Sequence, residues 1–141
     1  MRCEEVMKRD VQCVSSRESV QLAAQRMATG NIGFLPVCDE AGVVLGAVTD
    51  RDLVLRVLAH GKPETTPIAD VFTQEVVACH PGDDLVEAQT MMAKHHKSRI
   101  MCLDEQNHVV GVISLSDIAQ QSSEARAAKT LRQVSEREAR A

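Results

Sequence analysis

Aromatic residues are scarce in this chain of 141 residues: tryptophan and tyrosine are absent, and Phe34 and Phe72 are the only phenylalanines. The core is therefore expected to be aliphatic, built from Val, Leu, Ile, Ala and Met. No run of residues approaches the roughly 18 apolar positions that a membrane-spanning helix needs. The first residues contain no apolar signal region, so we expect a cytoplasmic protein with no membrane partner.

An excess of basic residues is also missing. The chain has 16 Lys and Arg against 20 Asp and Glu, which gives a formal net charge of −4. This balance argues against DNA or RNA as the main partner, because binding to a phosphate backbone requires a basic surface. The sequence contains no GxSxG, HExxH or P-loop motif, and it therefore indicates no enzyme class.

An internal repeat is the strongest feature that is present. The segment from Val6 to Leu53 aligns without a gap with the segment from Val71 to Ile118. Identical residues fall at structurally important positions, and the apolar periodicity of the two segments matches. The identical pairs include Val6/Val71, Met27/Met92, Asp39/Asp104, Gly46/Gly111 and Asp52/Asp117. A duplication of this kind has to be recognised before any other argument about the fold.

Each copy has the pattern of a β-α-β-β-α unit. Short apolar runs predict strands at 11–14, 34–38 and 43–48, with helices from Val20 to a stop near Gly30 and at 50–59. The second copy repeats the pattern at 76–79, 85–93, 100–103, 109–113 and 116–121. Gly42 and Asn107 occupy the hairpin turns, at the positions expected to need a positive φ. We divide the chain into a first unit at 1–62, a second at 63–121 and a polar C-terminal helix or tail at 122–141.

The tail has two interpretations. It is rich in helix-forming residues and contains no glycine or proline. Its few apolar residues fit an exposed, partly ordered tail, or a helix that docks on a second subunit.

The duplicated unit resembles the cystathionine-β-synthase (CBS) domain pair, and most closely the small free-standing bacterial members of that family. The segments that carry the resemblance are the opening Val6-Met7, Gly33–Val37 followed by Asp39, Gly46–Asp52 and Gly111–Asp117. The resemblance implies an α/β (α+β) fold of two tandem βαββα CBS units. It also implies that the units form a pseudo-two-fold pair with a ligand cleft on either side of their interface. Such pairs commonly assemble further into homodimers.

The repeated motif, Gly-x-apolar-Thr/Ser-x-x-Asp, joins a strand to a helix. A helix N-terminus offers unpaired N–H groups and a partial positive charge, both of which suit a phosphate. Thr49 and Ser114 add a hydroxyl at that point. An ionised carboxylate accepts hydrogen bonds from two hydroxyls, as a ribose diol provides. The resemblance assigns Asp52 and Asp117 to the ribose, and the two hydroxyls to the phosphate. Helix capping is the alternative role for all four residues.

Other residues complete the candidate sites. In the first copy Arg51 is the candidate phosphate ligand, and in the second copy the candidates are Arg99, Lys97 and His80. Because each copy draws its arginine from a different position, we expect the two sites to differ in affinity or to share one polyphosphate ligand. The candidate lining of an adenine pocket comes from the first two strands of each copy: Cys13, Val14, Gly33, Leu35, Pro36, Ala78, Cys79, Ile100 and Met101.

The resemblance implies a non-catalytic regulatory module without a prosthetic group. Its ligand would be an adenine nucleotide (AMP, ADP or ATP) or S-adenosylmethionine, and it would act in trans on an unidentified target protein. A ligand-independent assembly module is the first alternative. A metal or redox sensor is the second, since 5 cysteines and 5 histidines are available. No Cys/His spacing matches a structural zinc site, and the odd cysteine count without an export signal favours reduced thiols.

Overall fold

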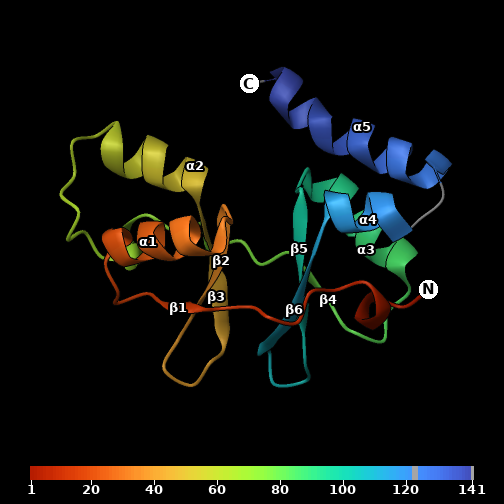
Figure 1. The fold of residues 1–141 in the computed structure, drawn as a ribbon, viewed down its shortest axis with the longest axis horizontal. Coiled ribbons are helices and arrows are strands. Elements are labelled where there is room, and N and C mark those ends of the chain that lie inside the picture. Colours follow the sequence, from red (N-terminus) through yellow and green to blue (C-terminus); the bar gives the residue numbers. More distant parts are fainter. Residues whose placement is uncertain (122–123, 141) are drawn as a thin grey trace. The chain divides into compact units, whose positions relative to one another are not determined.

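The structure is a computed structural model that describes residues 1–121 and 124–140. It has the mixed α/β architecture expected from the sequence, with two repeated units and a C-terminal helix (Figure 1). The chain divides into two compact units. We call residues Gln12–Val76 the first-copy unit, and Met1–Val11 together with Val77–Ala141 the second-copy unit.

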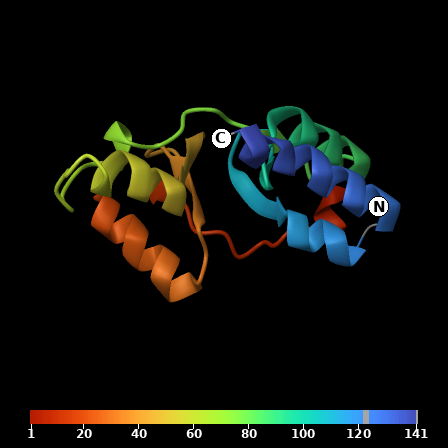
Figure 2. The same ribbon diagram turned by 90° about the horizontal axis from the view of Figure 1, so that it is seen from above.

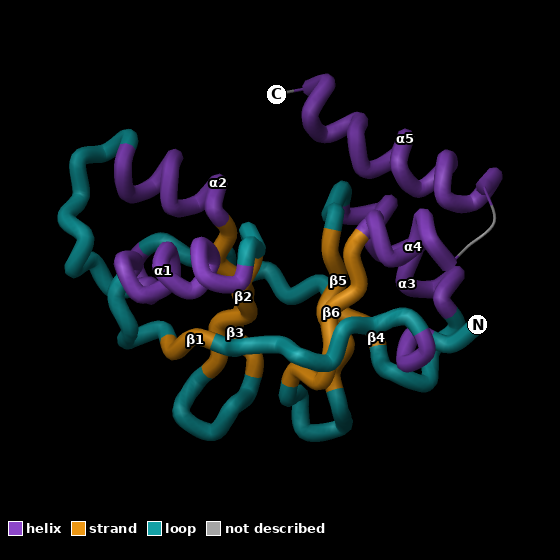
Figure 3. Tube along the Cα trace, in the orientation of Figure 1, coloured by secondary structure: helices purple, strands orange, loops and turns teal. Residues whose placement is uncertain are grey.

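The first-copy unit is a three-stranded sheet with helices. Its elements are β1 (Val14–Ser15), α1 (Val20–Gly30), β2 (Phe34–Cys38), β3 (Val44–Thr49), α2 (Asp50–Asp52), η2 (Leu53–Leu58) and η3 (Ile68–Asp70). The strand order is β1-β2-β3, with β1 parallel to β2 and β2 antiparallel to β3. The helix that starts at α2 continues into the π-helical turns of η2, as the tube in Figure 3 shows.

The second-copy unit repeats this arrangement and adds elements at both ends of the chain. Its elements are η1 (Cys3–Glu5), β4 (Ala78–Cys79), α3 (Leu85–His95), β5 (Arg99–Leu103), β6 (Val109–Ser114), α4 (Leu115–Gln121) and α5 (Glu124–Arg140). The strand order is β4-β5-β6, again with one parallel and one antiparallel pair. Leu35 pairs with Val48 in the first sheet, and the repeat-equivalent Ile100 pairs with Ile113 in the second.

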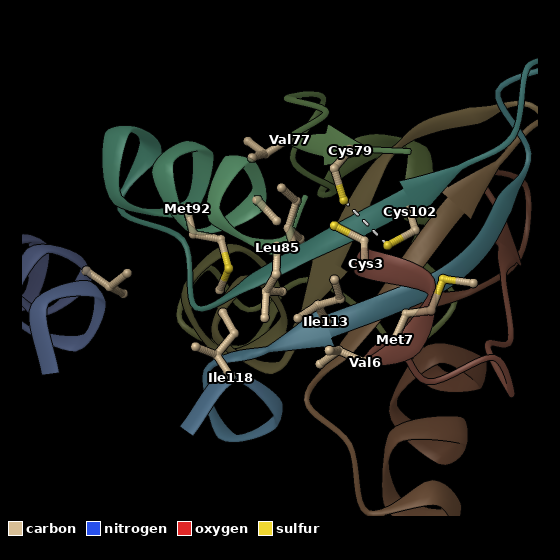
Figure 4. Close-up of a cluster of buried hydrophobic side chains, with 13 residues drawn as sticks. Cys3, Val6, Met7, Val77, Cys79, Leu85, Met92, Cys102, Ile113 and Ile118 are labelled. Atoms are coloured by element: carbon tan, nitrogen blue, oxygen red, sulfur yellow. Dashed lines mark hydrogen bonds between the residues drawn. The ribbon is translucent and has the colours of Figure 1, made fainter. Parts of the chain in front are cut away.

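The segments that open the two sequence copies are exchanged between the units. Val6 and Met7 open the first copy, yet they belong to the apolar core of the second-copy unit, beside Ile113 and Cys102 (Figure 4). Val71 opens the second copy and is 1% exposed in the core of the first-copy unit. Compact packing therefore follows different boundaries from the division at 62 and 63 that the sequence repeat suggests.

The two hairpin turns adopt the backbone expected from the sequence. Gly42 has φ = 83° and Asn107 has φ = 62°, so the prediction of a positive φ at both positions is confirmed. The expected helix stop at Gly30 is displaced by one residue. Gly30 is the last helical residue, and the left-handed cap is Asn31 at φ = 51°. Asparagine tolerates this conformation because its short polar side chain hydrogen-bonds locally.

The C-terminal helix α5 packs against its own unit. It contacts α3 and α4, and Figure 2 shows it alongside α3. Val134 is 5% exposed and joins the apolar core of the second-copy unit, while Thr130 is 4% exposed. The imidazole Nδ1 of His96 donates to the carbonyl of Gln133 at 2.9 Å. Among the described residues, no helix combines the length and the apolar character needed to cross a membrane.

Candidate functional site

In the first-copy unit, the motif forms a reciprocal cap at the start of α2. The backbone N–H of Asp52 donates to Oγ1 of Thr49 at 3.1 Å, and the backbone N–H of Thr49 donates to Oδ2 of Asp52 at 3.0 Å. This capping box satisfies two donors that a helix start otherwise leaves unpaired. Asp52 is 8% exposed, so its carboxylate is held in a single orientation at the base of the helix.

The second-copy unit has the same arrangement at the start of α4. The backbone N–H of Ser114 donates to Oδ2 of Asp117 at 2.9 Å, and the N–H of Asp117 donates to Oγ of Ser114 at 3.2 Å. Ser114 Oγ also donates to the same carboxylate oxygen at 2.9 Å and lies 2.8 Å from the hydroxyl of Ser116. Asp117 is 8% exposed, as is its counterpart in the first unit. Helix capping is therefore a role that both motifs perform in this structure.

The second oxygen of each aspartate faces a cation that the sequence analysis missed. Oδ1 of Asp52 lies 3.7 Å from Nε of Arg56 and 3.4 Å from Oγ1 of Thr73. Oδ1 of Asp117 lies 3.6 Å from Nζ of Lys8. These distances exceed the 2.7–2.9 Å of a tight charge-assisted hydrogen bond. Each Oδ1 therefore keeps the capacity to accept a shorter hydrogen bond.

Two of these missed residues occupy one repeat position. Lys8 and Thr73 are equivalent in the gapless alignment, and each is carried by the exchanged opening segment. Thr73 forms a reciprocal pair of backbone hydrogen bonds with Ala47, at 3.0 and 2.9 Å, and Lys8 forms the same pair with Val112, at 3.0 Å for both bonds. The repeat alignment contained a signal for them, since it begins at Val6 and Val71. The alignment did not show the exchange of opening segments that brings Lys8 and Thr73 to the motifs.

The candidate phosphate residues do not all gather at one place. Arg99 pairs in register with Ser114 across β5 and β6, and Lys97 lies two positions before it in the chain. Arg51 is exposed within α2. His80 is different, because its Nδ1 donates to the carbonyl of Leu103 at 2.9 Å. Arg99 and Leu103 are the two ends of β5, about 13 Å apart at a rise of about 3.3 Å per residue.

His80 therefore lies at the other end of β5 from Arg99. Its backbone N–H also donates to Oδ2 of Asp83 at 2.8 Å, which fixes His80 in the turn before α3. The sequence alone did not show how far His80 lies from the motif of the second copy. The position of His80 depends on the parallel pairing of β4 with β5, which places Cys79 opposite Cys102.

The candidate adenine residues separate into two groups. Val14 and Leu35 belong to the core of the first-copy unit, and Cys79 and Ile100 belong to the core of the second-copy unit, so their side chains are already packed. Pro36 and Met101 are also buried, but they alternate along their strands with these core residues and point to the other sheet face. The remaining candidates, Cys13, Gly33 and Ala78, are partly buried.

Gly33 allows a close approach at the entry to β2. A Cβ at this position would lie 2.6 Å from Oδ2 of Asp50, and the backbone N–H of Asp50 donates to the carbonyl of Gly33 at 3.0 Å. The equivalent contact in the second copy joins Leu115 to Ser98, also at 3.0 Å. In both units a backbone hydrogen bond therefore joins the segment that enters the second strand to the start of the helix after the third strand. This bond positions each motif.

The thiols form two groups of neighbours. Cys79 Sγ lies 3.5 Å from Cys102 Sγ, and hydrogen bonding to Cys102 together with burial raises the pKa of Cys79 to about 12. A hydrogen bond from Cys38 lowers the pKa of Cys13 to about 7, although burial acts in the opposite direction. Within residues 1–121 and 124–140, no group of three or more His, Cys, Asp or Glu side chains is arranged to hold a metal ion.

Known proteins resemble this chain in sequence and in fold. The family model for the CBS domain matches residues 3–59 and 68–124. CBS domain-containing protein YhcV of Bacillus subtilis (strain 168) is 37% identical over 116 residues, which cover 82% of this chain and 81% of YhcV.

Two solved structures extend the comparison. The CBS domain pair of protein MJ0100, in complex with 5′-methylthioadenosine and S-adenosyl-L-methionine, has a TM-score of 0.77 and 25% identity over 85% of this chain and 94% of that one. Hypoxic Response Protein I, with two coordinated zinc ions, has a TM-score of 0.77 and 28% identity over 87% of this chain and 100% of that one. Because the two ranges matched by the family model span most of the chain and each contains one capping-box motif, this chain belongs to the CBS domain family and carries two CBS domains.

Proposed function

We propose that this CBS domain pair is a non-catalytic regulatory module that binds an adenine nucleotide or an adenosyl ligand through its Asp52 and Asp117 motifs and acts on another protein. Free-standing CBS domain proteins are generally non-catalytic regulatory modules. The observation that carries the proposal is that Asp52 and Asp117 make equivalent contacts. Each uses Oδ2 for its helix cap and directs Oδ1 at a cation that is 3.6 or 3.7 Å away.

The position of Oδ1 in each aspartate suits the binding of a ribose diol. A carboxylate oxygen offers two lone pairs, and a hydroxyl that approaches to about 2.7 Å would form a stronger bond than the long contact to Lys8 or Arg56. Because the cap fixes Oδ2, the carboxylate does not have to reorient when a ligand arrives. A preorganised acceptor loses little conformational entropy on binding.

The hydroxyls at the motifs support phosphate binding with unequal strength. Thr49 Oγ1 acts as the cap acceptor, and its proton can be donated to a phosphate oxygen. Ser114 Oγ instead donates its proton to Asp117 Oδ2. Binding at the second motif therefore requires Ser114 to exchange a hydrogen bond, and we expect the first motif to bind the phosphate more tightly. Arg51 and Arg99 remain the proposed phosphate ligands, one for each motif, with Lys97 beside Arg99.

An adenosyl group is the ligand moiety that the comparisons support. The MJ0100 domain pair was solved with two adenosyl compounds, which differ in the groups attached to sulfur. For this chain the choice among AMP, ADP, ATP and S-adenosylmethionine stays within the proposal. The proposed adenine contacts are the partly buried Cys13, Gly33 and Ala78, together with Pro36 and Met101 on the sheet faces opposite the core residues.

A ligand-independent assembly module is the second candidate, and two observations favour it. Both motif aspartates are satisfied as helix caps without any ligand. The helix formed by α2 and η2 also exposes apolar side chains, with Leu58 76% exposed, Val54 52% and Leu55 45%. Exposed apolar residues that cluster on one helix are typical of a protein–protein contact, here a homodimer.

A thermal-shift panel separates the two candidates. The protein is melted with AMP, ATP, S-adenosylmethionine and GMP, and ligand at about one hundred times its dissociation constant adds about 2.7 kcal/mol of stability, a rise of several degrees in Tm. We expect an adenine ligand to raise Tm, and Asp52→Asn or Asp117→Asn to reduce the rise. Asp10→Asn makes the same charge change at an exposed residue and serves as the control. Equal Tm values with all four compounds would favour the assembly module.

A further inference from the structure

A cavity between α3 and α5 of the second-copy unit lies outside both CBS motifs. Its volume is about 500 Å³, within the range of small-molecule sites. It is lined by Val86, Gln89, Thr90, Ala93 and Lys94 from α3, and by Arg126, Lys129, Thr130 and Gln133 from α5. The cavity thus exists because α5 folds back onto its own unit.

One residue that lines this cavity has an unsatisfied side-chain amide. Gln89 is 6% exposed, and its Nε2 has no hydrogen-bond partner in the part of the chain that the structure describes. A buried polar group without a partner is rare in folded proteins and calls for a specific explanation. Gln89 also lines an adjoining cavity of about 210 Å³. The terminal torsion of a glutamine is broad, so the amide can rotate when a ligand binds.

The lining carries charge of one sign. Lys94, Arg126 and Lys129 are exposed residues along its rim, and no carboxylate is among the lining residues that the structure describes. This concentration of cations stands out in a chain whose net charge is −4. Val86 and Ala93 add apolar surface from α3. Cations at the rim, apolar walls and a buried amide donor complement one chemical class of ligand.

We propose that the α3–α5 cavity binds a small amphiphilic anion, whose head group is a carboxylate or a phosphate on an apolar body. An oxygen of the anion accepts a hydrogen bond from the Gln89 amide, and the head group is attracted by Lys94 and Lys129. The apolar body lies against Val86 and Ala93. This site is independent of the adenosyl proposal, because it shares no residue with the motifs.

Nonanoate and octyl phosphate are the probes, and both carry an anionic head group on an eight-carbon alkyl chain. Each is titrated into isotope-labelled full-length protein while the side-chain amide protons of Gln89 are followed by NMR. We expect a saturable shift of these resonances with one or both anions, and none with 1-octanol, which has the same chain without the charge. The anion with the lower Kd identifies the head group. No saturable shift with either anion, or an equal shift with 1-octanol, would overturn the proposal.

Variants distinguish a binding role of Gln89 from a structural one. Gln89→Leu removes the unpaired amide, so it should keep or raise Tm while it weakens anion binding about tenfold, the loss of one hydrogen bond to a charged group. Lys94→Met and Lys129→Met should each weaken binding about two- to fivefold. Lys62→Met, in the exposed linker of the other unit, is the control and should change nothing. A lower Tm with unchanged affinity in Gln89→Leu would show a structural role and contradict the proposal.

Discussion

The ammonium of Lys8 lies 3.6 Å from Oδ1 of Asp117, although nearly the whole length of the two repeats separates them in the chain. The lysine side chain is 74% exposed and the aspartate side chain is 10% exposed. One partner is therefore well solvated, and the pair is closer to a surface ion pair than to a buried one. Surface pairs contribute at most about 1 kcal/mol.

We predict that Lys8→Met lowers the free energy of unfolding by less than about 1 kcal/mol. Ser114→Ala should cost about 1–2 kcal/mol, because it removes the cap acceptor for the backbone N–H of Asp117. Urea denaturation at low salt and in 1 M NaCl measures both variants. Only the Lys8→Met difference should shrink in 1 M salt, where the Debye length is about 3 Å. A larger loss for Lys8→Met than for Ser114→Ala would contradict this ranking.

The equivalent glycines of the two motifs should respond differently to substitution. A Cβ on Gly46 would overlap the backbone carbonyl oxygen of Thr73, a residue that is held by two backbone hydrogen bonds to Ala47. A Cβ on Gly111 would instead meet Sδ of Met7, at the end of a flexible side chain. We predict that Gly46→Ala costs more than about 2 kcal/mol and Gly111→Ala about 1 kcal/mol or less.

Chemical denaturation of this matched pair tests the prediction directly. The two substitutions are identical, the two positions are equivalent in the repeat, and only the neighbour differs. Equal losses of stability would show that Thr73 yields as easily as Met7, and that the exchanged segment is held loosely in both units.

Cys13 should be the most reactive thiol at neutral pH. A hydrogen bond from Cys38 stabilises its thiolate and lowers its pKa to about 7, whereas the pKa of Cys79 is raised to about 12. Because the thiolate is the nucleophile, alkylation of Cys13 by iodoacetamide should fall about tenfold for each pH unit below 7 and level off above it. Mass spectrometry of peptides identifies the modified residue.

Cys38→Val provides the control for that pH profile. It removes the thiol that stabilises the Cys13 thiolate, so the pKa of Cys13 should rise toward the ordinary value of 9.0. The midpoint of the alkylation profile should move upward with it. An unchanged midpoint would show that Cys38 does not determine the reactivity of Cys13.

The docking of α5 predicts a contrast between two of its apolar residues. Val134 is 5% exposed and packs in the core of the second-copy unit, whereas Leu131 is 54% exposed. Val134→Ala should lower the free energy of unfolding by about 2 kcal/mol, from lost burial and the cavity left behind. Leu131→Ala should change it by no more than about 0.5 kcal/mol. Thermal denaturation checks both, and equal effects would mean that α5 is not packed as described.

Local features of the fold were predictable from the sequence because they depend on neighbouring residues. The repeat from Val6 to Leu53 predicted two βαββα units, and the turn residues Gly42 and Asn107 have the positive φ that was expected. Helix capping by Thr49 and Ser114 is similarly local, since donor and acceptor lie three residues apart. Such interactions form wherever the chain bends into the same short motif.

Contacts between distant segments were decided only by the tertiary structure. The sequence placed Val6–Lys8 with its own copy, but the apolar side chains of Val6 and Met7 are buried in the second-copy unit, which brings Lys8 to Asp117. The parallel pairing of β4 with β5 likewise places His80 beside Leu103, at the other end of β5 from Arg99. The sequence left the polar tail either exposed or docked on a second subunit, whereas α5 buries Val134 in the core of its own unit. A sequence pattern specifies which face of an element must be buried, whereas the surface that covers it is chosen by packing among all the elements at once.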